Sequence, residues 1–141
     1  MTADQKESFV LALEEELLKG GVTLSEWATR ISQEATETFV SGHHLAALLT
    51  AVAAIETHLR AEGSASKTRL QDLVTQSGLD EGIKIEVHVL RRYRNRWVHV
   101  NAPWDDDSLL REPEVAEQEL FEMSKRSIAA MMKVLFSNQW V

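Results

Sequence analysis

Hydrophobic residues recur every three or four positions along most of the chain, which is the spacing of one face of an α-helix. Glycine and proline fall between these periodic segments. The pattern predicts helices over about residues 4–19, 24–39, 43–62, 66–77, 80–98 and 113–136. We therefore expect an all-α protein, an up-and-down bundle of five to six helices.

Turn and capping residues mark the expected helix ends. Gly20–Gly21 ends the first helix, and Thr23 with Glu26 has the spacing of a capping box for the second. Gly63 is expected to close the third helix in a left-handed conformation, and Pro113 to open the last one.

One segment, Ile83–Val89, also alternates between apolar and polar residues, as a strand does. A lone strand has no partner here. Because the same residues extend a helical stripe to Trp97, a helix is the preferred interpretation.

Two charged residues interrupt apolar stripes. Glu56 stands in the stripe of the third helix, and Arg94 stands in that of the fifth. A charge in an apolar stripe costs several kcal/mol unless it is paired. We therefore expect either an ion pair between Glu56 and Arg94 or a cleft onto which both open. The alternative is a stripe at the rim of the bundle, where both side chains reach water.

Composition narrows the possible chemistry. The chain has no cysteine, which excludes disulfides, thiolate nucleophiles and zinc–cysteine sites. Its first residues lack the apolar run of a signal peptide. The longest apolar stretch, Leu45–Ile55, is shorter than the ~20 residues of a membrane span. A cytoplasmic protein without membrane contact is the expectation.

Charge is distributed unevenly along the chain. The net charge is −7, yet residues 82–100 carry +4, which leaves −11 for the rest. This asymmetry is typical of a local anion site on an acidic body. The alternative is a solvated basic helix face offset by acidic neighbours.

Arg94 and His99 combine two chemical functions at the end of this basic segment. The guanidinium of arginine binds phosphate oxygens through two parallel N–H donors, and histidine transfers protons near neutral pH. Together they can cleave a phosphodiester through a ribose 2′-hydroxyl without a metal. Residues five apart on a helix differ by about 140° in direction, so the site needs a frayed helix end or a second subunit. The alternative is a histidine that only interacts with the helix dipole.

The segment Arg94-Asn95-Arg96-Trp97-Val98-His99 resembles the motif of HEPN domains, in which an arginine and a polar residue precede a histidine. The family's spacer of four to six residues fits Arg94 and also Arg92, and Asn95 favours Arg94. HEPN domains are helical bundles of about this length, with the motif late in the bundle before one more long helix. Glu56 matches an acidic residue that some members carry on an earlier helix.

This resemblance implies a single HEPN-like helical domain over residues 1–141, acting as a homodimeric, metal-independent endoribonuclease in a toxin–antitoxin or phage-defence system. Two copies of the motif would meet in one composite site, without cofactor or metal. The implied roles are catalysis by Arg94 and His99, orientation by Asn95 and Glu56, and attraction of RNA by three further arginines, Arg91, Arg92 and Arg96. Certain toxin members carry a tyrosine two residues after the histidine, where this chain has Asn101.

A non-catalytic helical module that binds a protein partner or regulates a defence system is the alternative function. Such a partner would contact Trp104, Trp140 and the acidic run Asp105–Asp107. The run lacks a convincing metal-ligand spacing and is more suited to capping a helix or binding a basic partner. Of the other tryptophans, Trp27 is expected in the core, and Trp97 beside the motif, at a position suited to a dimer interface.

Overall fold

The computed structural model describes residues 1–63 and 68–140 and contains, within them, helices and no strand. An all-helical bundle was predicted, and this is confirmed. Gly21 and Trp140 form an isolated antiparallel bridge that ties the first connection to the end of the chain. None of the described helices is both long and apolar enough to cross a membrane. The helices are α1 (Ala3–Leu17), α2 (Glu26–Val40), α3 (His44–Glu62), α4 (Leu70–Gln76), α5 (Glu81–Val98), α6 (Ser108–Arg111) and α7 (Pro113–Leu135).

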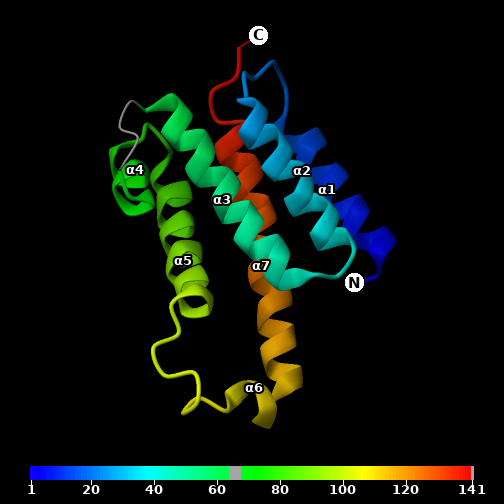
Figure 1. Cartoon of the computed structure of the whole chain (residues 1–141). Coiled ribbons are helices and arrows are strands. Elements are labelled where there is room, and N and C mark those ends of the chain that lie inside the picture. Colours follow the sequence, from blue (N-terminus) through cyan, green and yellow to red (C-terminus); the bar gives the residue numbers. More distant parts are fainter. Residues whose placement is uncertain (64–67, 141) are drawn as a thin grey trace.

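Helices α3 and α7 form the centre of the bundle. Each packs on the other and on α2 and α5, while α1 covers α2 and α7 and α4 packs on α3 and α5. Figure 1 shows α3 crossing in front of α7, with α5 on one side and α2 on the other. Several alanines on α3, among them Ala47, Ala51 and Ala54, are fully buried. Their small side chains allow neighbouring helices to approach the axis of α3 closely.

The segment Ile83–Val89 is helical, so the strand alternative is wrong. It forms the first half of α5, whose buried side chains are Val87, Leu90 and Tyr93. These residues are three apart, so they lie on one face of the helix and contact the core. Arg94, one residue further, is half-buried at the edge of this face.

Two predicted helix ends differ from the structure. Ser25, and not Thr23, is the N-cap of α2, and its hydroxyl accepts a hydrogen bond from the Ala28 N–H. Glu26 therefore becomes the first helical residue, which removes the predicted capping box. Gly63 is the C-cap of α3 in an extended conformation with φ −93°, so no left-handed cap forms there. Pro113 opens α7, as predicted.

The two short helices also depart from the sequence pattern. The predicted helix over 66–77 begins at Leu70, while part of its expected first turn lies outside the described residues. Helix α6 was not predicted. The Asp106 carboxylate accepts hydrogen bonds from the N–H and the hydroxyl of Ser108, and these bonds lower the pKa of that carboxyl. Part of the acidic run therefore organises the start of α6.

Trp27 is not in the core, because its side chain is 76% exposed. The inner face of α2 is formed by Ala28, Ala35 and Phe39, all fully buried. These residues recur at intervals of seven and four, so they define a stripe one position away from Trp27. The amphipathic pattern of the sequence does not decide between two stripes that differ by one residue.

Gly21 provides space for the indole of Trp140. A Cβ atom added at Gly21 would lie 2.5 Å from Cε2 of Trp140, whereas one added at Gly78 would meet nothing within 4 Å. We expect Gly21→Ala to lower the free energy of unfolding by about 1–3 kcal/mol, because the added methyl overpacks this contact. Urea denaturation measures the effect, with Gly78→Ala as the matched control. Equal stability of the two variants would contradict the close packing of Trp140 on Gly21.

Candidate functional site

A pocket of about 420 Å³ opens between α3, the start of α4 and the last turns of α5. We call it the arginine pocket, because arginines are its commonest lining residues. Figure 1 shows these three helices as neighbours on one side of the bundle. The pocket is lined by Glu56, Arg60, Thr68, Arg69, Leu70, Gln71, Arg91, Arg94, Asn95 and His99.

Helical periodicity explains why α3 and α5 each place several polar residues here. Glu56 and Arg60 are four residues apart on α3, so they share one face. Arg91, Arg94 and Asn95 have the offsets zero, three and four on α5 and also share a face. Because α5 packs on both α3 and α4, these faces border the same opening.

Glu56 is paired with Arg60 and not with Arg94. Arg60 Nη1 donates to Glu56 Oε2 at 3.0 Å, and Arg60 Nη2 donates to the Thr68 carbonyl at 2.7 Å. Among the described residues, Glu56 has no ion pair with Arg94. The predicted Glu56–Arg94 ion pair is therefore wrong, because Arg60 lies one turn away on the same helix. The second possibility, a cleft onto which both residues open, is what the structure contains.

The side chain of Asn95 holds the guanidinium of Arg94. Its Oδ1 accepts hydrogen bonds from Arg94 Nε at 3.1 Å and from Arg94 Nη2 at 2.9 Å. A guanidinium has five N–H donors, so the remaining ones stay available to a ligand. Asn95 thus fixes the direction of Arg94 without neutralising its charge.

His99 lies immediately after α5, where the helical conformation has ended. It is the C-cap residue with φ −130° and ψ 60°, its N–H donates to the Asn95 carbonyl at 3.0 Å, and it is exposed. Because His99 is not helical, the 140° separation expected along an ideal helix does not apply. Arg94 and His99 therefore line one pocket within a single chain.

Several cations lie close together along α5. Burial, followed by the charges of Arg92, Arg94 and Arg69, lowers the pKa of Arg91. Burial and three nearby cations, Arg91, Arg92 and Lys84, likewise lower the pKa of His88. Like charges held together in this way attract an anion.

Of the three arginines predicted to attract RNA, only Arg91 lines the pocket. Arg92 is exposed outside it. Arg96 lies over the ring of Tyr93, 5.3 Å from its centroid, and approaches Glu119 of α7 at 3.6 Å. The attraction of RNA by Arg92 and Arg96 stays a prediction, now from positions outside the pocket.

Sequence reasoning missed Arg60 and Arg69 as lining residues. The sequence contained a signal for Arg60 as a lining residue, since Arg60 follows Glu56 by one helical turn and shares its face. Arg69 had none, because its position depends on how α4 packs on α3 and α5.

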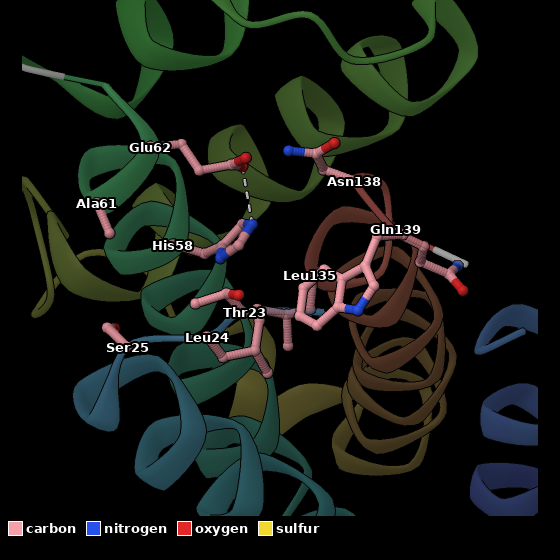
Figure 2. A pocket seen from close by; sticks show the side chains of 10 residues that line it. Thr23, Leu24, Ser25, His58, Ala61, Glu62, Leu135, Asn138 and Gln139 are labelled. Atoms are coloured by element: carbon pink, nitrogen blue, oxygen red, sulfur yellow. Dashed lines mark ion pairs between the residues drawn. The ribbon is translucent and has the colours of Figure 1, made fainter. Parts of the chain in front are cut away.

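A second pocket, of about 480 Å³, lies at the C-terminal end of α3. Figure 2 shows the buried imidazole of His58 pointing toward the carboxylate of Glu62, with Asn138 across the pocket. His58 Nε2 lies 2.8 Å from Glu62 Oε1, but the contact is too poorly aligned for a hydrogen bond. Since no arginine or lysine lines this pocket, it does not suit a phosphate.

In the part of the chain that the structure describes, no three histidine, aspartate or glutamate side chains converge as metal ligands. Asp105–Asp107 therefore do not form a metal-binding group with their neighbours.

Comparison with known proteins adds no assignment, since no family model, no curated protein and no solved structure matches the chain. The fold and the pocket define the class of protein: an α-helical bundle with an arginine-rich pocket that contains a histidine.

Proposed function

We propose that this chain is a metal-independent endoribonuclease of the HEPN type, which cleaves RNA in the arginine pocket. The observation that carries the proposal is the convergence of Arg94, Asn95 and His99 on one pocket. The resemblance rests on these same residues, and the surrounding positive charge suits a polyanion.

The reaction is a transesterification at phosphorus. The ribose 2′-oxygen attacks the phosphorus, the bond to the 5′-oxygen breaks, and a 2′,3′-cyclic phosphate and a 5′-hydroxyl form. His99, exposed at the mouth of the pocket, accepts the 2′-hydroxyl proton, and the leaving 5′-oxygen takes up a proton from solvent. Arg94 binds the scissile phosphate and stabilises the charge that develops on it.

Two residues support these groups. Asn95 positions Arg94 through the two hydrogen bonds to its guanidinium. Glu56, which sequence reasoning assigned to Arg94, instead positions Arg60 in the same pocket. Arg91 attracts the RNA backbone from the adjoining turn of α5.

We further propose a homodimer that serves a toxin or phage-defence role. Support comes from a protruding apolar surface at the end of α5, in the following loop, in α6 and at the start of α7. These segments extend below the other helices in Figure 1. Exposed apolar side chains gathered in one stretch of the chain are typical of an interface, and a second copy would cover them. The exposed apolar side chains of this stretch are Val98, Val100, Trp104, Leu109, Leu110 and Val115.

The same surface supports the alternative function, a non-catalytic module that binds a protein partner. Trp104 is 97% exposed beside the acidic run Asp105–Asp107, and Trp140 is 56% exposed at the other end of the bundle. An exposed indole flanked by carboxylates suits a partner with basic and apolar side chains.

Incubation of the protein with RNA in the presence of EDTA tests the proposed function. We expect cleavage that leaves 2′,3′-cyclic phosphate ends, together with RNA binding that weakens steeply as salt is added. Products with 3′-hydroxyl ends, or cleavage only after a divalent metal is added, would contradict the proposal. Salt-insensitive capture of a protein without RNA cleavage would favour the binding module.

A further inference from the structure

The arginine pocket contains more positive charge than one scissile phosphate requires. Among its arginines, Arg60 is neutralised by Glu56 at 3.0 Å, and Arg69 approaches Asp72 only at 3.9 Å. Within residues 1–63 and 68–140, Arg91 and Arg94 have no carboxylate within ion-pair distance. The pocket therefore presents three guanidinium groups with little or no acidic compensation.

Arg91 combines partial burial with the repulsion of neighbouring arginines. Its side chain is partly buried, and its Nε is enclosed with no hydrogen-bond partner among the described residues. Its pKa is lowered by burial and by the neighbouring arginines, which include Arg69 and Arg94. A buried donor without an acceptor costs free energy, and so does the repulsion between like charges. An anion bound in the pocket relieves the repulsion between these guanidinium groups.

The position of Arg91 separates it from the catalytic residues. It precedes Arg94 by three residues on the same face of α5, whereas His99 lies beyond Arg94 at the end of the helix. Arg69, at the start of α4, faces the same pocket from the other side. In the proposed reaction Arg69 has no role, and Arg91 only attracts the RNA backbone without touching the scissile phosphate.

We propose that Arg69 and Arg91 form a second phosphate subsite, which binds the phosphate next to the scissile one on the same RNA strand. The inference rests on the proposed function for the position of the scissile phosphate at Arg94. The substrate is then recognised through two consecutive phosphates, ordered along α5 from Arg91 to His99. A planar guanidinium is suited to this, because it binds phosphate oxygens through two parallel N–H donors.

Binding of non-cleavable 2′-deoxydinucleotides tests the subsite without requiring catalysis. The probes are a dinucleotide with its single internal phosphate and the same molecule carrying an additional 5′- or 3′-phosphate. We expect the additional phosphate at one of the two ends to strengthen binding to the wild-type protein about tenfold, the size of one charge-assisted hydrogen bond. The end that responds gives the direction of the strand.

Three variants assign the effect to residues. Arg69→Gln and Arg91→Gln should each abolish the gain from the additional phosphate, and each should weaken binding of the singly phosphorylated probe by a smaller factor. The salt slope for a single-stranded oligonucleotide should also fall by about 0.7 in each variant. Arg30→Gln is the matched control, because Arg30 is an exposed arginine of α2 outside the pocket.

The outcomes separate this inference from the proposed function. A phosphate gain that depends on Arg69 and Arg91, in a protein that does not cleave RNA, would support the subsite and overturn the ribonuclease. RNA cleavage with no phosphate gain, or with a gain that both variants retain, would overturn the subsite alone. Arg69→Lys and Arg91→Lys keep the charge, so they provide folded variants if a glutamine variant is unstable. They should lose part of the gain.

Discussion

His99→Ala is expected to lower the rate of metal-free RNA cleavage by about 10²–10⁴-fold, the contribution of a general acid–base group. His99 is exposed at the mouth of the arginine pocket and follows the last helical residue of α5. Its side chain makes no packing contribution to the core, so the free energy of unfolding should stay close to that of the wild type. The measurement is the initial rate of cleavage in EDTA.

Two further variants sharpen this test. His43→Ala removes another exposed histidine, at the N-cap of α3 outside the arginine pocket, and should leave cleavage unchanged. Asn95→Ala should reduce cleavage less than His99→Ala, because Asn95 acts by holding Arg94. Cleavage by His99→Ala at the wild-type rate would remove His99 from the catalytic site.

His44→Ala is expected to lower the free energy of unfolding by about 1.5–3 kcal/mol, the range for a hydrogen bond to a charged group. Lys6 of α1 is only 7% exposed, and its ammonium lies 2.9 Å from His44 Nε2. Since an ammonium is only a donor, Nε2 must accept, and the His44 Nδ1–H then donates to Glu117 at 3.0 Å. Without His44, a buried ammonium loses its acceptor.

The environment of Lys6 strengthens this expectation. Its Nζ lies 5.7 Å from the ring centroids of both Phe39 and Phe121, so the charge is enclosed by aromatic rings. These rings stabilise a cation but accept no ordinary hydrogen bond from it. Removing the His44 ring also opens a space against Phe121, whose ring it meets edge-on at 5.2 Å.

Urea denaturation of two histidine variants measures the effect. His43→Ala is the matched control, because His43 is the exposed neighbour without a side-chain capping bond. The double variant Lys6→Met with His44→Leu should recover much of the lost stability, since apolar residues can replace a buried polar pair. Equal stability of His44→Ala and His43→Ala would show that the Lys6 contact contributes little.

The all-α fold was predictable because a periodicity of three to four residues is a local property of the sequence. Pro113 illustrates this, since its fixed φ and missing N–H suit the first turn of α7 in any tertiary context. Trp27 shows that periodicity does not fix which residues of a helix face the core, because Ala28 is buried there and Trp27 is not. Small and large apolar residues next to each other leave two faces possible, and only packing against α3 chooses between them.

The candidate site likewise has one part that the sequence could predict and one part that it could not. Arg94, Asn95 and His99 lie within six residues, so helix geometry and the end of α5 decide their relation to one another. By contrast, Glu56 had two possible arginine partners, and the contact with Arg60 became clear only from side-chain geometry. Arg96, although part of the motif segment, lies over Tyr93 and approaches Glu119 of α7.

The sequence by itself determined the helical class, most helix positions and the local cluster of basic and proton-transferring residues at the end of α5. Only the tertiary structure decided which charges face one another across the pocket. Arg60 and Arg69 join Arg91 there because α3, α4 and α5 pack together. The physical reason is that helical periodicity acts over a few residues, whereas the contacts that group distant charges depend on how whole helices pack.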